Sequence, residues 1–488
     1  MHRRRWNLNV KNESLSTTFA KRIFGFSMAS WINCAISLIS TPITTALFFP
    51  KELGKINLFI SFANILIPFI YLGFDQAYVR FFNEPTGKNT PESTFKLCLI
   101  ISSLMSCLTS LVVFCGWKYF SRSIIGYESL SIALCLAVYL FATMILRYVN
   151  LKARMENNVK LFCTQSVTST IIIKLSFASV AIIKANAQYA IIARTVLLLL
   201  AAIIFSYSAL LKCKKERIDY SKSAITELGK FALPIFPTTF LIMLNVSLAQ
   251  LMLNKYADYT MIGIYSNAVT IASIITIVQS GLNTFWTPFV YEYYKEQSRI
   301  QKMHHVITCV MLCMPLGLIA VKDLVYLVLV DQKYWASKSI MAILLISPIS
   351  DTVSETLGLG IELSKKTYLK LPVYIINIAV NFTACYFLIP RFGIYGAALA
   401  NALASLSMLI SKTIIGERYY KCSDTYYRLV LGMVIVATIA IINYYINNSI
   451  LITILAVFGI LIICLLYKTT LKALIEIAKP IVRKSIRR

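Results

Sequence analysis

Long apolar runs alternate with short polar segments along almost the whole chain. Most runs reach the length of about 20 apolar residues that a helix needs to cross a bilayer. A strand of a membrane barrel would instead alternate between apolar and polar positions over about ten residues. The pattern predicts membrane-spanning helices, and we place fourteen of them at residues 23–49, 55–80, 95–117, 129–149, 161–183, 187–211, 231–254, 260–290, 305–330, 336–361, 369–389, 393–415, 426–446 and 449–467.

The composition excludes most other classes of protein. The chain has 488 residues and is 58% hydrophobic and 14% charged, whereas soluble domains carry about 25% charged residues. No polar gap between two runs exceeds 20 residues, so we expect no soluble domain. The 12 Cys and three His form no metal-binding pattern. No nucleotide-binding or catalytic motif stands in a loop, and we therefore predict that the protein is not an enzyme.

The basic residues predict how the chain is oriented. There are 48 Lys and Arg against 21 Asp and Glu, which gives a net charge of +27. With the N-terminus in the cytoplasm, 36 of these 48 residues fall on the cytoplasmic side, ten on the other side and two within spans. This asymmetry is typical of multi-pass membrane proteins. It predicts that both termini are cytoplasmic, and it disfavours nucleic-acid binding because no soluble module carries the charge.

The first six spans and the next six are weakly similar to each other. Gly54, directly before the second span, aligns with Gly263 of the eighth, and a Leu-Gly or Gly-Leu pair stands near the far end of each span. Two parallel repeats that face each other enclose a central cavity. We predict an all-α integral membrane protein of about 14 transmembrane helices, in two pseudo-symmetric six-helix bundles plus two C-terminal helices. Its parts are a cytoplasmic N-terminal tail at 1–22, a first bundle at 23–211, a cytoplasmic basic linker at 212–230, a second bundle at 231–415, two extra helices at 416–467 and a basic cytoplasmic tail at 468–488.

Three segments resemble a known family. Residues 24–82 contain a P-x-x-x-G turn and then an LG…R ending, residues 231–289 contain LP, GIYS and WTPF, and residues 358–404 contain LIP-x-x-G-x-x-GAA. In this order, and with fourteen spans, they resemble the polysaccharide-biosynthesis (Wzx-type) flippases. These belong to the multidrug/oligosaccharidyl-lipid/polysaccharide (MOP) exporter superfamily.

The resemblance implies a MATE-like fold and a transport function. The substrate would be an undecaprenyl-pyrophosphate-linked oligosaccharide repeat unit that crosses the bacterial inner (cytoplasmic) membrane by alternating access. It would serve the assembly of O-antigen lipopolysaccharide, capsule or exopolysaccharide. The implied partners are this lipid-linked substrate, membrane lipids, a glycan polymerase and chain-length proteins, and no nucleic acid. No cofactor is expected, and H⁺ or Na⁺ is the implied coupling ion.

Two basic residues lie well within predicted spans: Lys174 in the fifth and Arg194 in the sixth. A charge at the bilayer centre costs at least about 2.5–3.5 kcal/mol, so each needs a partner or a function. A pyrophosphate needs cations to enter the membrane, and Arg can bind phosphate with two parallel hydrogen bonds while Lys acts as a point charge. We predict that Lys174 and Arg194 bind the substrate's pyrophosphate. The alternatives are a structural ion pair or snorkelling to the interface.

Further charged residues near span ends are secondary candidates. Arg80 and Arg147 end the second and fourth spans on the cytoplasmic side, where the head group would first be met, although interfacial snorkelling explains them more simply. Asp351 and Glu355 lie four residues apart, so they share one face of a helix. Neighbouring carboxylates can carry a proton or hold Na⁺, and this pair is our candidate for ion coupling. A helix break, or a salt bridge to Lys322 or to a basic loop residue, is the alternative.

Other functions remain open at this stage. A lipid II flippase would share the topology and the anionic substrate. A multidrug antiporter of the same superfamily would need an acidic or aromatic cavity for cationic drugs. A membrane-embedded glycan polymerase or ligase usually has a large outer loop, whereas the longest outer gap here is about a dozen residues.

Overall fold

The computed structural model describes residues 12–87, 89–181, 185–213, 221–364, 366–446 and 448–469. Most of the predicted tail at 468–488, the first half of the tail at 1–22 and part of the linker at 212–230 lie outside these residues. Every regular element within them is helical.

The first bundle begins with the longest helix of the chain. Its helices are α1 (Asn12–Leu47), α2 (Pro50–Tyr71), α3 (Phe74–Arg80), α4 (Pro91–Cys115), α5 (Trp117–Ile125), α6 (Leu130–Met155), α7 (Val159–Ala181) and α8 (Ala187–Cys213). The predicted linker contains a helix of its own, α9 (Lys222–Ala232), which packs against α3. Phe231 at its end lies edge-on to Phe81, with 5.7 Å between the ring centroids.

The second bundle and the two C-terminal helices follow. Their elements are η1 (Leu233–Ile235), α10 (Phe236–Tyr256), α11 (Tyr259–Ala272), α12 (Ile275–Tyr293), α13 (Gln297–Ala320), α14 (Lys322–Leu329), η2 (Gln332–Tyr334), α15 (Ser337–Leu344), α16 (Ile346–Leu357), α17 (Leu359–Leu363), η3 (Thr367–Leu369), α18 (Lys370–Phe392), α19 (Ile394–Glu417), α20 (Tyr426–Tyr445) and α21 (Ser449–Leu466).

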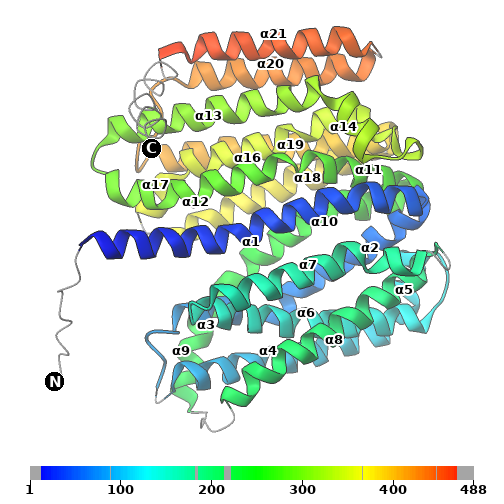
Figure 1. Cartoon of the computed structure of the whole chain (residues 1–488), viewed down its shortest axis with the longest axis vertical. Coiled ribbons are helices and arrows are strands. Elements are labelled where there is room, and N and C mark those ends of the chain that lie inside the picture. Colours follow the sequence, from blue (N-terminus) through cyan, green and yellow to red (C-terminus); the bar gives the residue numbers. More distant parts are fainter. Residues whose placement is uncertain are drawn as a thin grey trace.

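The long helices run side by side in two groups, and α1 lies between them (Figure 1). The α1 helix begins and the α21 helix ends at the same end of the molecule, which we call the inner end; the opposite end is the outer end. The α20 and α21 helices lie along the far edge of the second bundle, where α21 packs against α13. The α2 helix packs against both α10 and α11, so it joins the two bundles.

Twelve helices among the described residues are long and apolar enough to cross a membrane, and the bent pair α11 and α12 makes a thirteenth span if it is counted as one. The α1 helix contains most of the first predicted span, at 23–49. The prediction of an all-α membrane protein with about 14 spans is therefore confirmed.

Several predicted spans are broken helices rather than continuous ones. The predicted span 55–80 divides into α2 and α3 because Leu72 and Gly73 adopt positive φ angles of 44° and 83°. The predicted span 260–290 bends by 45° between α11 and α12. There Ser273 Oγ donates to Thr270 O at 2.6 Å, and such side-chain bonds compete with the helix backbone. Within 336–361, Pro348 lacks an N–H group and follows the break between α15 and α16.

Two glycines allow the bundles to meet closely near the outer end. A Cβ atom on Gly54 of α2 would lie 1.8 Å from Tyr259 O, and one on Gly263 of α11 would lie 2.0 Å from Pro50 O. Only glycine therefore permits this contact between the helix backbones. The aligned glycines of the two predicted halves face each other across the junction of the bundles.

A short segment of the second bundle also bonds to the first at the outer end. We call residues 331–334, which include η2, the outer strap. Lys333 Nζ donates to Ala46 O at 2.8 Å, and Tyr334 OH donates to Phe48 O at 2.9 Å. The outer strap thus ties the end of α1 to the second bundle.

Candidate functional site

Lys174 and Arg194 line one cavity where the two bundles meet. This central cavity has a volume of about 80 Å³ and is enclosed by α1, α2, α7 and α8 of the first bundle and by α11 of the second. Its lining residues are Ser40, Thr41, Thr44, Leu53, Ile56, Asn57, Ile60, Ile173, Lys174, Phe177, Arg194, Ser266, Asn267 and Thr270. The structure therefore brings together the two cations that the sequence placed within spans.

The charge of the central cavity is not neutralised by its walls. No Asp or Glu stands among the described residues that line it. Arg194 is only 3% exposed, and its buried Nε atom has no hydrogen-bond partner. The guanidinium carbon lies 5.8 Å from the centre of the Tyr139 ring. A buried, incompletely paired guanidinium is costly, and an anionic ligand would supply the missing partner.

Neutral polar side chains complete the wall. Thr41 and Thr44 of α1 donate their hydroxyl protons to the helix carbonyls of Ser37 and Thr41, both at 2.9 Å. Asn267 of α11 donates its amide to Ser337 Oγ at 3.0 Å. These hydrogen bonds fix the orientation of the side chains. Because the residues are neutral, Lys174 and Arg194 remain the charged groups among the described lining of the cavity.

Arg80 and Arg147 do not line the central cavity, and each has an acidic partner. Arg80 Nη1 lies 3.0 Å from Glu84 Oε2, and both side chains are more than half exposed. Arg147 Nη2 lies 3.1 Å from Asp75 Oδ2, and the Arg147 side chain is 44% exposed. Their role in pyrophosphate binding stays a prediction, and the ion pairs offer a structural role for both.

The predicted acidic pair lies inside the second bundle. Asp351 and Glu355 both belong to α16, and Glu355 Oε1 lies 2.5 Å from Nζ of Lys412 on α19. Lys412 is only 3% exposed. The partner is thus neither Lys322 nor a loop residue. Lys322 instead donates to Asn443 of α20. The structure brings two carboxylates and one buried ammonium together, an arrangement that can exchange a proton or a small cation.

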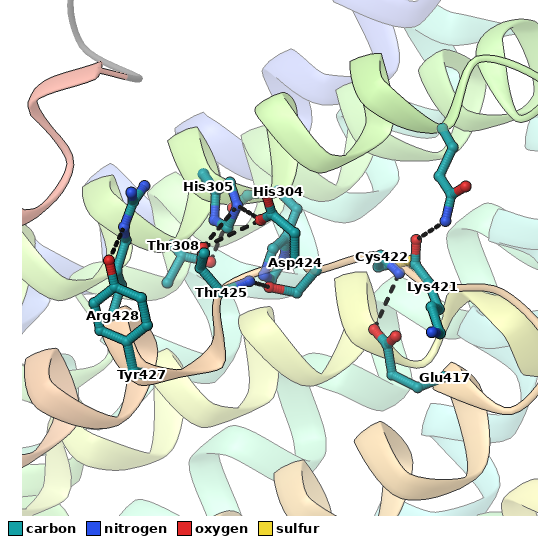
Figure 2. Close-up of polar contacts among 12 residues, drawn as sticks. His304, His305, Thr308, Glu417, Lys421, Cys422, Asp424, Thr425, Tyr427 and Arg428 are labelled. Carbon is teal, nitrogen blue, oxygen red and sulfur yellow. Dashed lines mark hydrogen bonds and ion pairs between the residues drawn. The ribbon is translucent and has the colours of Figure 1, made fainter.

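A histidine cluster that the sequence did not single out lies near the start of α13, where its side chains face Asp424 and Thr425 (Figure 2). His305 Nε2 donates to Asp424 Oδ1 at 2.6 Å, and Thr425 Oγ1 donates to the same oxygen at 3.1 Å. His304 Nδ1 lies 2.8 Å from Thr356 Oγ1. The hydrogen bond from His305 holds the pKa of the Asp424 carboxyl below its usual value. The bond from His305 to Asp424 attaches the segment before α20 to α13, and the contact of His304 with Thr356 joins α13 to α16.

No group of three or more His, Cys, Asp or Glu side chains that could hold a metal ion occurs among the residues with described positions. One ring nitrogen of each histidine has a partner, which is a hydroxyl for His304 and a carboxylate for His305.

Lys412 and Gln165 are the site residues that sequence reasoning missed. Lys412 stands near the cytoplasmic end of the predicted span 393–415, where the sequence predicts an interfacial charge rather than a buried one. Gln165 of α7 is 2% exposed, and neither atom of its amide has a hydrogen-bond partner. A neutral side chain in a span carries no charge signal, and Gln165 stands within the hydroxyl-rich stretch TQSVTST at 164–170, so nothing in the sequence singles it out.

Comparisons with known proteins agree with this architecture. The chain resembles the solved structure of the lipid II flippase MurJ in an inward closed conformation, with a TM-score of 0.67 and 14% identity over 91% of this chain and 99% of that one. It also resembles the solved structure of the MATE multidrug transporter DinF-BH, with a TM-score of 0.58 and 14% identity over 84% of this chain and 97% of that one. At such identities the likeness concerns the fold alone. No curated protein sequence matches the chain.

The fold is that of a multi-pass membrane protein built like MurJ and the MATE transporter DinF-BH. The model of the polysaccharide biosynthesis protein family matches residues 19–293, which is more than half of the chain. The chain belongs to this family, and the predicted relationship to the polysaccharide-biosynthesis flippases is confirmed.

Proposed function

We propose that the protein is a flippase that moves undecaprenyl-pyrophosphate-linked oligosaccharide repeat units across the bacterial inner membrane. The observation that carries this proposal is the pair Lys174 and Arg194 in one cavity between the bundles, with no acidic residue among its described lining. A pyrophosphate is the anionic group of such a substrate, and hydrocarbon alone would exclude it.

The central cavity as described is too small for the substrate, so transport would need a movement of the two bundles. Its volume of about 80 Å³ is far below the roughly 300–1,000 Å³ of a small-molecule site. The bundles must separate before a pyrophosphate with its sugar enters. Because the walls come from both bundles, rocking of one against the other would open the cavity first to one side and then to the other. The lipid tail would stay in the bilayer during this movement.

The cellular context belongs to the same proposal. The transported glycan would serve O-antigen, capsule or exopolysaccharide assembly, which the polysaccharide-biosynthesis family supports. Both termini would be cytoplasmic, in line with the charge asymmetry of the loops. Membrane lipids surround the protein, and a glycan polymerase and chain-length proteins would act on the exported unit. The protein would move its substrate without chemical change and without a cofactor.

Coupling to an ion gradient is the second part of the proposal. Asp351 and Glu355 would take up H⁺ or Na⁺ on α16, in competition with Lys412 for the carboxylates. The α16 helix also packs against α12, which contacts α1 at the junction of the bundles. A change of charge at the acidic pair could therefore alter how the bundles pack.

Two alternatives within the superfamily differ in what they require of the site. A multidrug antiporter would hold cationic drugs, and the cationic walls of the central cavity repel them. A lipid II flippase would carry the same pyrophosphate and fits the cavity equally well. The match to the polysaccharide biosynthesis family favours a polysaccharide repeat unit over lipid II.

The test is glycan export by cells that depend on this protein. Lys174→Met and Arg194→Gln should each reduce surface glycan at least tenfold while the protein remains in the membrane at its normal level. Lys51→Met and Arg391→Gln are the matched controls, because both side chains are exposed and lie outside the cavity. Normal export by both cavity variants would refute the proposed function.

A further inference from the structure

A second cavity lies inside the first bundle, closer to the inner end. This inner cavity has a volume of about 300 Å³ and is bounded by α2, α6, α7 and α8. Ile173 of α7 lines both the inner cavity and the central cavity. Lys174, the next residue, belongs to the central cavity alone. The two cavities are therefore neighbours that meet at Ile173.

The inner cavity differs from the central cavity in charge. Arg147 is the charged residue among its described lining, and Asp75 neutralises it at 3.1 Å. The other polar lining residues are amides and hydroxyls, namely Tyr71, Thr143, Asn150, Gln165, Ser166, Ser169 and Thr170. A neutral ligand with many hydroxyl groups matches this wall better than an anion does, because hydroxyls both donate and accept hydrogen bonds.

The hydrogen bonds already made in the wall leave acceptors for a ligand. Thr170 Oγ1 donates to Ser166 O at 3.0 Å, and Asn150 Nδ2 donates to Phe162 O at 3.3 Å. Ser166 Oγ accepts from Asn33 Nδ2 at 2.8 Å. The threonine hydroxyl oxygen and the Asn150 amide oxygen keep free lone pairs.

Gln165 is the second, independent observation. Its side chain lines the inner cavity and is 2% exposed, and both its Nε2 and its Oε1 lack a hydrogen-bond partner. Buried amides are almost always paired, so an unpaired one asks for an explanation. An amide that donates from nitrogen and accepts at oxygen is suited to two adjacent hydroxyls of a sugar ring.

We propose that the inner cavity is a saccharide subsite that holds a sugar next to the pyrophosphate, with the pyrophosphate in the central cavity. This inference rests on the proposed function and divides the head group between two sites. A volume of about 300 Å³ stands at the lower limit for small-molecule sites, which suits one sugar ring rather than a whole oligosaccharide. Ile173 would contact the junction of sugar and phosphate.

The experiment compares two lipids on the full-length protein in lipid nanodiscs. One is undecaprenyl pyrophosphate without sugar, and the other is the repeat-unit lipid extracted from the cells that make this protein. Gln165→Leu should bind the sugar-free lipid as the wild type does and the sugar-bearing lipid about tenfold more weakly, as expected for two lost hydrogen bonds. Its melting temperature should equal or exceed that of the wild type, because an unpaired buried amide has been removed.

A matched pair on the same helix serves as control. Thr170→Val removes a hydroxyl that lines the inner cavity, whereas Thr168→Val removes one that lines neither cavity. Only Thr170→Val should weaken binding of the sugar-bearing lipid. Lys174→Met should weaken binding of both lipids.

The outcomes separate this inference from the proposed function. If Gln165→Leu and Thr170→Val bind the sugar-bearing lipid normally while Lys174→Met weakens both lipids, the saccharide subsite is refuted and the flippase proposal stands. A lower melting temperature of Gln165→Leu with loss of both lipids would make the amide structural and would also refute the subsite. If Lys174→Met binds both lipids normally, the proposed function itself fails.

Discussion

At the scale of single residues, the buried cations of the bundles differ in whether the protein supplies them with a hydrogen-bonding or acidic partner. Arg194 has a buried Nε atom without a hydrogen-bond partner, whereas Lys412 has a carboxylate partner at 2.5 Å. Removing one partner of a buried ion pair destabilises the fold, because the other charge is left buried and unpaired. An incompletely paired charge is better explained by a ligand. The two cations should therefore respond differently to substitution.

Lys412→Met should destabilise the protein by about 1–3 kcal/mol, because Glu355 loses its counter-charge beside Asp351. The value lies below that for a fully buried pair, since the Glu355 side chain is 39% exposed. The double variant Glu355→Gln with Lys412→Met should lose less stability than the two single variants added together. Thermal unfolding in detergent measures all four proteins, with Lys51→Met as the exposed control. Additive losses would show that the pair does not interact.

Asp424 gives a dependence of stability on pH. Its pKa is lowered in the folded protein by the hydrogen bond from His305. Stability from this bond is therefore fully present above the ordinary Asp pKa of about 3.9 and is lost as pH falls through the lower pKa of the folded state. Asp424→Asn should reduce stability by at most about 1 kcal/mol, since this carboxylate is 59% exposed.

Melting curves between pH 7 and pH 3 test this expectation. The difference in melting temperature between wild type and Asp424→Asn should be present at pH 7 and should shrink at the acid end of the range. A difference that grows as the pH falls would contradict the sign derived for Asp424.

Lys174 and Arg194 could be predicted because a charge interrupts an apolar run, which any sequence reveals. Lys412 could not, because the end of its span is uncertain by a few residues and the charge falls inside that margin. Gln165 could not, because its importance depends on the absence of a partner, which only the packed helices define. The outer strap is likewise unpredictable, because it bonds through backbone carbonyl groups that every residue carries.

At the scale of helices, the contact of α2 with α11 depends on two glycines. Gly54→Ala would place a methyl group 1.8 Å from Tyr259 O, so the helices would have to move apart. We expect a loss of about 1–3 kcal/mol in stability, as for other overpacked sites. Gly317→Ala in α13 is the matched control, because a Cβ atom there meets nothing within 4 Å.

Thermal unfolding of the two glycine variants distinguishes packing from helix propensity. Alanine favours a helix over glycine by up to about 1 kcal/mol, so Gly317→Ala should be neutral or stabilising. Gly54→Ala should be destabilising and should also reduce transport. Equal melting temperatures for Gly54→Ala and wild type would show that α2 and α11 do not meet as described.

The elements themselves were largely predictable, since continuous apolar runs indicate spanning helices. Their breaks were not. Gly73 and Pro348 are visible in the sequence, yet other prolines stand within unbroken helices, such as Pro68 in α2 and Pro315 in α13. Whether a helix bends or breaks depends on what packs against it, as Ala232 does against Gly73.

At the scale of the whole molecule, two kinds of contact join the bundles at the outer end: close helix packing at glycines, and hydrogen bonds from the outer strap. The two glycines fix how closely α2 and α11 approach, while the outer strap adds hydrogen bonds from Lys333 to Ala46 O in α1 and from Tyr334 to Phe48 O just after it. The similarity of the two halves and the positions of the basic residues predicted two bundles with a cavity between them. They did not predict at which end of the molecule the bundles are in contact. If the protein is the proposed flippase, these contacts must break before the substrate leaves at the outer end, so their strength would set the population of the outward-open state.

Tyr334→Phe tests this link between the outer strap and transport. The variant removes one hydrogen bond to Phe48 O, worth about 1 kcal/mol, and should raise the outward-open population about fivefold relative to the state described here. Spin labels on the exposed residues Lys51 and Lys255, introduced as a non-canonical amino acid, would report the separation of the bundles at the outer end. Tyr445→Phe is the control, because Tyr445 is 77% exposed. An unchanged distance distribution in Tyr334→Phe would mean that the bond from Tyr334 to Phe48 O contributes nothing to the balance between states, and that the glycine contact and the Lys333 bond hold the outer end closed without it.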